Sequence, residues 1–293
     1  MEKAEFLRKS EGFLRWMGQL ISSEVKVGFK HSEGVDRTLG EAFSRYRWPN
    51  KRVDIETPRG NLSLKAHSDF AANAGLLDFL SQGMQECLAQ DLPDSEELAD
   101  WARAIMKWGG VYTRIGRNRD KGNAAWLDSN RAEFLAYLSP VLQALSEENG
   151  KAHYAVENLR SNAGMTKIYS LILPKFVIYD SRVAAALAWL VREWSIREGQ
   201  TVAPHLQFLC MRANTSRAGG KQRSPDEKVF RYFVASGDLR NHQKHATWNL
   251  RANWLIDAAI EKARETASLP EQWTSRHVEA ALFMMGDDLA HAL

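Results

Sequence analysis

The residues of this chain most able to do chemistry are Lys167 and Asp180, in the stretch from Asn162 to Leu187. Asp180 directly precedes a helical apolar pattern, which places its carboxylate at the N-cap of a new helix. A carboxylate held there can stabilise developing positive charge, and a neutral lysine amine can act as a nucleophile. The same position has a purely structural explanation, because an N-cap aspartate gains roughly 1 kcal/mol from a backbone N–H bond.

A short helix and an extended segment must position these two residues. Gly164 ends whatever precedes it, the apolar spacing predicts a helix from Thr166 to Leu173, and Pro174 prevents its continuation. Phe176 to Tyr179 is predicted to be an extended, apolar lead-in to Asp180. The helix after Asp180 is predicted from apolar residues at helical spacing, namely Val183, Leu187, Leu190 and Trp194.

Helical periodicity dominates the rest of the chain. The spacing predicts a mainly α fold, with at most a minor β-hairpin between Tyr46 and Leu64, where Pro58 and Gly60 interrupt alternating apolar residues. We expect one compact unit over 1–293, or alternatively two lobes, about 1–130 and 131–293, with the cleft between them.

The composition is that of an ordinary globular protein: 293 residues, 44% hydrophobic and 26% charged. No apolar run approaches the roughly 18 to 20 residues that cross a bilayer, and the N-terminus lacks the apolar core of a secretory signal. We therefore expect a cytoplasmic protein without a membrane partner.

The number and spacing of the cysteine and histidine residues do not predict a metal centre. Cys87 and Cys210 are the two cysteines, and they lie far apart, so neither a zinc site nor an iron–sulfur cluster is expected. His242 and His245 have helical spacing but no carboxylate or thiol at ligand spacing beside them. We expect no metal and no cofactor.

The order of elements from Asn162 to Trp194 resembles the core of the helix-hairpin-helix DNA glycosylases of the 8-oxoguanine glycosylase type. The shared order is a glycine-containing hairpin, a lysine-bearing helix, an apolar connector and an aspartate that begins the next helix. The resemblance implies that Asp180 and Lys167 are catalytic, and that amides around Gly164 and Thr166 hold a DNA phosphate. It also implies double-stranded DNA with a modified base as the partner.

The charge distribution leaves room for a phosphate-binding face, although a merely solvated surface explains it as well. The net charge is only +3, but bases gather in two stretches, and acids gather elsewhere, for instance in Leu92 to Asp100. Arg182 is equally well explained as a phosphate ligand or as a core ion-pair residue. The expected DNA contacts are Arg182, Arg217, Lys221 and Arg223, besides Gly164 and Thr166.

Aromatic residues beside the Gly109–Gly110 break are candidates for a base pocket. A flipped base needs a stacking partner in a dry cavity, and Trp108 and Tyr112 would supply it. The competing interpretation is that these rings fill the core, as most tryptophans do.

Together these features predict an enzyme, a DNA N-glycosylase that flips a modified base and leaves an abasic site, with lyase activity as an open question. The resemblance extends to anti-phage glycosylases that remove glucosylated hydroxymethylcytosine, and a housekeeping repair glycosylase for an oxidised or alkylated base fits equally well. The alternative from another class is a non-catalytic helical DNA-binding protein in which Asp180 is only a cap. A nuclease is disfavoured, because no Asp and Glu cluster has metal-ligand spacing near the basic segments.

Overall fold

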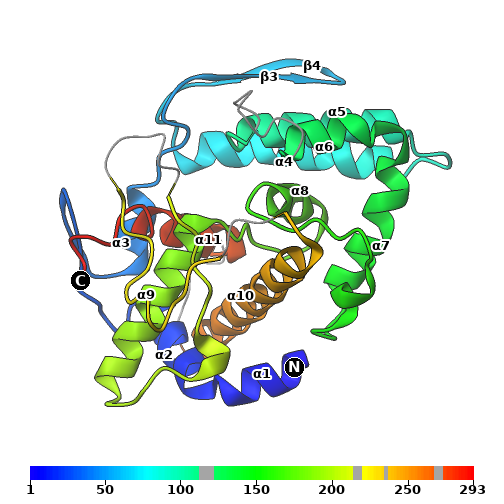
Figure 1. The fold of residues 1–293 in the computed structure, drawn as a ribbon. Helices are drawn as coiled ribbons and strands as arrows, with labels where there is room; N and C mark the ends of the chain where they lie inside the picture. Colours follow the sequence, from blue (N-terminus) through cyan, green and yellow to red (C-terminus); the bar gives the residue numbers. More distant parts are fainter. Residues whose placement is uncertain (112–121, 214–219, 234–236, 267–272) are drawn as a thin grey trace. The chain divides into compact units, whose positions relative to one another are not determined.

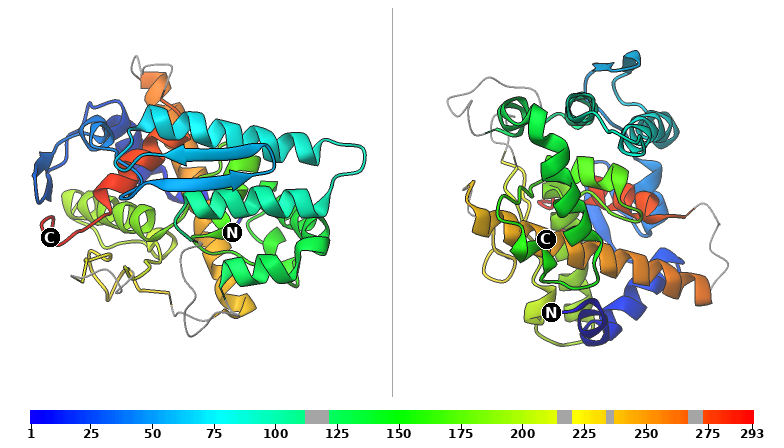
Figure 2. Two further views of the ribbon diagram at one scale, coloured as in Figure 1. Left: turned by 90° about the horizontal axis from the view of Figure 1, so that it is seen from above. Right: turned by 90° about the vertical axis from the view of Figure 1, so that its right-hand side faces the viewer.

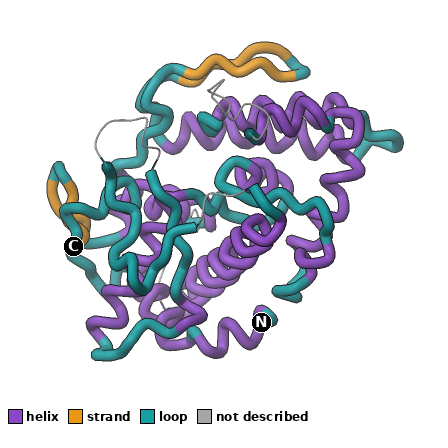
Figure 3. The backbone as a smooth tube through the Cα atoms, viewed as in Figure 1, coloured by secondary structure: helices purple, strands orange, loops and turns teal. Residues whose placement is uncertain are grey.

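The computed structural model describes residues 1–111, 122–213, 220–233, 237–266 and 273–293 (Figure 1). The described residues form a mainly α fold with little strand, as the helical periodicity predicted. Strands occur there only as two small antiparallel hairpins (Figure 3). The predicted hairpin is β3 (Val53–Thr57) with β4 (Gly60–Leu64), and the other, which the sequence did not predict, is β1 (Phe29–His31) with β2 (Gly34–Asp36).

The chain divides into two compact units that are not consecutive halves. Unit 1 comprises Met1–Tyr46, Glu148–Lys151 and Val177–Leu293, and unit 2 comprises Arg47–Glu147 and Ala152–Phe176. The chain thus passes from unit 1 into unit 2 twice before it ends in unit 1. Lys167 belongs to unit 2 and Asp180 to unit 1.

Unit 1 is a helical cluster around the long helix α10 (Leu239–Thr266). The other helices of this unit are α1 (Lys3–Lys9), α2 (Glu11–Ile21), α3 (Leu39–Ser44), α9 (Ser181–Arg197), the short η4 (Pro204–Leu206) and α11 (Ser275–Met285), and the β1–β2 hairpin also belongs to it. Helix α2 packs against α10 at Gly18, where an added Cβ would lie 3.3 Å from the carbonyl oxygen of Ala259. Helix α11 packs on both α3 and α9.

In unit 2, two helices lie side by side beneath the β3–β4 hairpin (Figures 1 and 2). They are α4 (Phe70–Leu88) and α5 (Ser95–Trp108), and they approach closely at Gly83, where an added Cβ would lie 2.3 Å from the Trp101 ring. Asp94 begins α5 by accepting the amide of Glu96. The remaining elements are α6 (Asn123–Ser129), η2 (Arg131–Glu133), α7 (Phe134–Ser146), η3 (Ala152–Ala155) and α8 (Met165–Ile172).

The local predictions around the site are confirmed. Helix α8 lies one residue earlier than the predicted Thr166 to Leu173, and Phe176 to Tyr179 is a buried segment without helix or strand. Asp180 is the N-cap of α9. None of the described helices is long and apolar enough to cross a membrane.

Candidate active site

Asp180 caps α9 with a single oxygen of its carboxylate. Its Oδ1 accepts the backbone N–H of Arg182 at 2.9 Å and that of Val183 at 3.0 Å. Its Oδ2 makes no hydrogen bond or ion pair with any described residue, and the residue is only partly buried. The N-terminus of α9 carries the positive end of the helix dipole, which favours a negative charge at this place. The carboxylate is therefore oriented and retains one oxygen that can face a developing cation.

The backbone that leads to Asp180 is held by polar side chains of α10. The amide of Val177 donates to Asn253 Oδ1 at 2.7 Å, and the carbonyl of Val177 accepts from Asn249 Nδ2 at 2.9 Å. Further along, His245 Nε2 lies 3.0 Å from the carbonyl oxygen of Tyr179. His245, Asn249 and Asn253 follow one another at intervals of about one helical turn and therefore lie on one face of α10. This face makes the hydrogen bonds to the backbone that a neighbouring strand would make to an extended segment.

Helix α11 supplies the remaining backbone contact of this connector. The amide of Ile178 donates to Glu279 Oε2 at 2.7 Å. Arg276 Nη1 donates to the same oxygen at 2.9 Å, which keeps the carboxylate in place. The peptide groups immediately before Asp180 are thus fixed from two helices.

Sequence reasoning missed this set of side chains, although the sequence contains a signal for it. His245, Asn249 and Asn253 recur at four-residue steps along a helix whose other buried residues are mostly apolar, such as Leu250 and Ile256. A polar row on a buried helix face indicates partners that need hydrogen bonds.

The predicted cations of unit 1 gather on one carboxylate. Arg182 Nη2 lies 2.8 Å from Asp287 Oδ1, Arg223 Nη2 lies 3.5 Å from the same oxygen, and Lys221 pairs with Asp287 Oδ2. Burial raises the pKa of Asp287, but Arg182 and Lys221 outweigh burial, and the pKa of this carboxyl lies below its usual range. These three bases are engaged inside the protein, and their contact with DNA stays a prediction.

A ring and a glycine complete this corner of unit 1. The guanidinium of Arg182 lies 4.1 Å from the centre of the Phe283 ring, which in turn lies 6.0 Å from the Tyr46 ring. Gly286 follows α11 and touches the start of α9: an added Cβ would be 1.8 Å from the carbonyl oxygen of Arg182. This close approach fixes the first turn of α9, where the Asp180 carboxylate is bound.

Tyr46 is a buried phenol in the electrostatic field of the site. Burial, then the negative charge of Glu279 and, more weakly, that of Asp180 raise the pKa of Tyr46 well above its usual range. Its hydroxyl is therefore neutral at any physiological pH.

Lys167 has quite different surroundings in unit 2. The residue is 8% exposed, and its ammonium donates to the carbonyl oxygen of Ala163 at 3.0 Å. Its stem lies against Gly109, where an added Cβ would be 2.2 Å from Lys167 Cδ. The catalytic role of Lys167 stays a prediction, and its amine must leave this carbonyl before it can attack.

The hairpin amides before α8 are occupied by Asn162. The N–H groups of Gly164 and Met165 donate to Asn162 Oδ1 at 3.0 and 3.1 Å, and Thr166 is fully buried. An added Cβ at Gly164 would lie 2.2 Å from Asn123 Nδ2, so a close neighbour requires glycine here. A phosphate at Gly164 would have to displace the Asn162 amide oxygen, and the DNA contacts of Gly164 and Thr166 stay predictions.

Trp108 packs as a core residue. It is 5% exposed, and its indole N–H donates to Asn73 Oδ1 at 3.1 Å. Asn73 Nδ2 donates in turn to the carbonyl of Trp48 at 2.8 Å, so the ring is locked in a polar network. Tyr112 and Arg217, the other predicted pocket and DNA-binding residues, lie outside the described residues.

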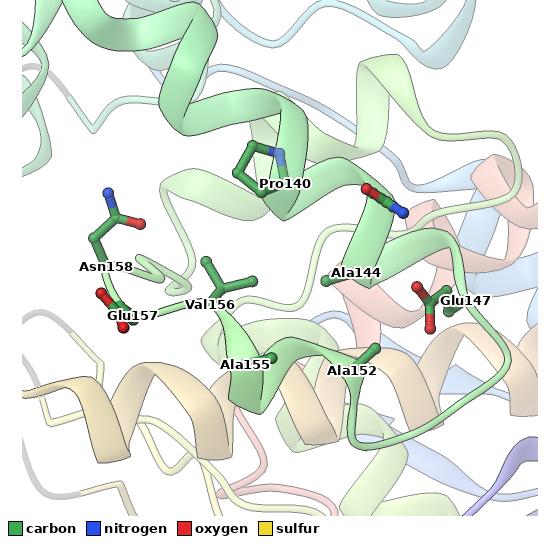
Figure 4. Close-up of a pocket in the computed structure, with 9 residues that line it drawn as sticks. Pro140, Ala144, Glu147, Ala152, Ala155, Val156, Glu157 and Asn158 are labelled. Carbon is green, nitrogen blue, oxygen red and sulfur yellow. The ribbon is translucent and has the colours of Figure 1, made fainter.

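Unit 2 also has a shallow groove of about 460 Å³ beside α7 (Figure 4). Pro140 and Ala144 of α7 lie on one side and Ala155 and Val156 on the other, as Figure 4 shows. The groove contains none of the predicted site residues. Within the described part of the chain, no group of three or more His, Cys, Asp or Glu side chains is arranged to hold a metal ion.

Comparison of the chain with family models, with curated proteins and with solved structures finds no match. The likeness to helix-hairpin-helix glycosylases therefore rests on the residues from Asn162 to Trp194 alone. The geometry around Asp180 is the independent ground for a functional proposal.

Proposed function

We propose that this protein is a DNA N-glycosylase in which Asp180 stabilises the positive charge that forms on the deoxyribose. The single observation that carries the proposal is the Asp180 carboxylate itself, which is oriented by α9 through Oδ1 and leaves Oδ2 without a partner among the described residues. The cap uses only Oδ1. Oδ2 therefore stays available for the electrostatic role that we propose.

The reaction breaks the bond between C1′ of the sugar and the base nitrogen. The bonding electron pair leaves with the base, and the sugar carries positive charge that a nearby carboxylate stabilises. Water then adds to C1′ and loses a proton, which gives an abasic site and the free base. Because the carboxylate is fixed before the substrate arrives, little reorganisation is needed in the transition state.

The substrate class follows from the resemblance rather than from the geometry. Double-stranded DNA with a modified base is the proposed partner. The candidate bases are glucosylated hydroxymethylcytosine, which would make the activity a defence against phage, and an oxidised or alkylated base, which would make it repair. The base must leave the stack to reach Asp180, so base flipping is part of the proposal.

The test is release of base from duplexes that differ in a single nucleotide. Purified protein is incubated with unmodified DNA and with duplexes that contain uracil, 8-oxoguanine or glucosyl-hydroxymethylcytosine, and free base and alkali-labile sites are measured. Asp180→Asn is the matched variant, because asparagine caps a helix almost as well but carries no charge. Tight DNA binding without base release from any duplex would instead favour the non-catalytic DNA-binding protein.

Lys167 decides whether the enzyme also cuts the strand. A lysine that attacks C1′ displaces the base, forms a Schiff base and permits strand cleavage without alkali. Lys167→Met keeps the apolar stem that lies against Gly109 and removes the amine. If Lys167 is the nucleophile, the variant loses alkali-independent breaks; if water is, wild type and variant give the same abasic product.

A further inference from the structure

The connector before Asp180 has an unusual set of hydrogen-bond partners. Both backbone polar groups of Val177, which belong to two successive peptide groups, are bound by side chains of α10, and the amide of Ile178 is bound by a side chain of α11. Extended segments normally obtain these bonds from a neighbouring strand. Here two asparagines and a glutamate, all far away in the sequence, provide them.

If Asn249 and Asn253 served only to stabilise the fold, they would do so inefficiently, because each also buries a polar atom without a partner among the described residues. Asn249 is 1% exposed and Asn253 is 7% exposed. Each amide uses one atom on Val177, while Asn249 Oδ1 and Asn253 Nδ2 are buried and make no hydrogen bond with a described residue. A buried polar atom without a partner costs about 1 to 3 kcal/mol. Their effect is to fix the orientation of the two peptide groups on either side of the Val177 Cα.

That orientation is passed on to Asp180 through a short piece of backbone. The Val177 N–H and C=O set the plane of the chain on both sides of Cα, Glu279 sets the Ile178 amide, and His245 approaches the Tyr179 carbonyl. Asp180 follows at once. Helix α9 fixes the carboxylate from the other side through its first amides.

We infer that Asn249, Asn253 and Glu279 are positioning residues that hold the Asp180 carboxylate in its reactive place. This inference rests on the proposed glycosylase function, in which the position of Asp180 sets the rate of bond cleavage. Misplacement of a catalytic group by about 1 Å can reduce a rate by two orders of magnitude. Loss of the clamp should therefore lower the rate of the chemical step and leave DNA affinity unchanged.

The two asparagines allow a variant that breaks the clamp to be compared with one that keeps it. Asn249→Leu removes the donor to the Val177 carbonyl, whereas Asn253→Asp keeps an acceptor for the Val177 amide. Both substitutions keep the approximate size of a buried side chain and lie one turn apart on α10, so a general effect of substitution on this buried face is common to both. We expect Asn249→Leu to lower the single-turnover rate of base release about tenfold, with Kd for DNA within twofold, and Asn253→Asp to stay within threefold of wild type.

Glu279 provides a second pair that separates hydrogen bonding from charge. Glu279→Gln keeps an acceptor for the Ile178 amide, and Glu279→Met removes it. The positioning role predicts a slow chemical step for Glu279→Met and a nearly normal one for Glu279→Gln. If Glu279→Gln is as slow as Glu279→Met, the charge of Glu279 matters and the positioning role is overturned.

Hydrogen–deuterium exchange of the peptide that contains Val177 and Ile178 tests the clamp without reference to activity. Asn249→Leu should speed exchange there about tenfold relative to wild type, while Asn253→Asp leaves it within threefold. Equal exchange and equal rates in both asparagine variants would overturn the inference. Absence of base release from wild-type protein would overturn the proposed function, and the exchange experiment would still report whether the clamp exists.

Discussion

Asp180 and Lys167 come from the same stretch of sequence, yet the structure gives them opposite surroundings. Asp180 is partly exposed, and Oδ2 of its carboxylate has no partner among the described residues. Lys167 is 8% exposed, and its ammonium is bound to the Ala163 carbonyl. Two residues that are close in the sequence can therefore differ in how far their charged groups are engaged by the protein itself.

The supports of the two residues also differ. The first turn of α9 rests on the backbone at Gly286, whereas the Gly109 site is filled by the flexible stem of Lys167. A backbone atom cannot move away from a new side chain without moving a helix, but a lysine stem can rotate. A substitution at Gly286 should therefore disturb the protein more than the same substitution at Gly109.

The largest loss of stability is expected from substitution of Gly286, which supports the first turn of α9, and the matched substitution is at Gly109, beside Lys167. Gly286→Ala would place a Cβ 1.8 Å from the Arg182 carbonyl oxygen. We expect a loss of more than about 3 kcal/mol of unfolding free energy in urea denaturation, because overpacking against backbone is not relieved by side-chain movement. Gly109→Ala is the matched control and should cost about 1 kcal/mol while it displaces Lys167. Equal losses of unfolding free energy in the two variants would contradict the expected difference between the Gly286 and Gly109 sites.

Removal of the carboxylate that gathers the cations of unit 1 comes next. Asp287→Asn leaves Arg182, Lys221 and the buried Arg223 without their shared partner, and we expect a loss of about 2 kcal/mol at neutral pH. Because the folded state lowers the pKa of Asp287, its contribution is complete above the ordinary carboxyl pKa and disappears as the pH falls through the lowered value. Urea denaturation of wild type and variant across pH 7 to pH 2 should therefore give curves that converge at low pH; a constant difference would argue against the ion-pair account.

The cap of α9 should give a smaller effect on stability. Asp180→Ala removes the acceptor for the Arg182 and Val183 amides, and we expect a loss of about 1 kcal/mol. Asp180→Asn should stay within about 0.5 kcal/mol of wild type, because the asparagine oxygen accepts the same bonds. Thermal unfolding of both variants measures this difference. Loss of folding in Asp180→Asn would mean that the charge itself holds the helix.

The smallest effect is expected at an ion pair of unit 2 that has no link to the site. The Arg131 guanidinium hydrogen-bonds Asp100 and lowers the pKa of that carboxyl, but the Asp100 side chain is 42% exposed. Solvent screening limits such a pair, and Asp100→Asn should cost less than about 1 kcal/mol in urea denaturation. A loss as large as that of Asp287→Asn would show that burial does not separate these two carboxylates.

The sequence was sufficient to predict the local helices but not their partners. Apolar spacing predicted the helix that begins after Asp180, and the N-cap preference of aspartate placed the carboxylate on it. Pro174 and the extended run after it predicted the connector. These signals are local, so they survive without knowledge of the rest of the fold.

The partners could not be predicted because they depend on contacts between distant segments. Nothing near Val177 indicates that Asn249 and Asn253 bind its peptide, or that Glu279 binds the next amide. The sequence around Arg182 did not indicate whether its guanidinium binds a phosphate or pairs with Asp287. The sequence also did not indicate which segments form each unit, because unit 1 is assembled from three separate segments and unit 2 from two.

The central claim is tested most directly by base release from the four duplexes with wild-type protein and with Asp180→Asn, under single-turnover conditions and with folding checked in parallel. The account predicts free base and alkali-labile sites from one modified duplex, and a rate at least about 10²-fold lower for the folded variant. Base release at an unchanged rate in Asp180→Asn, or none from any duplex with wild-type protein, would contradict it.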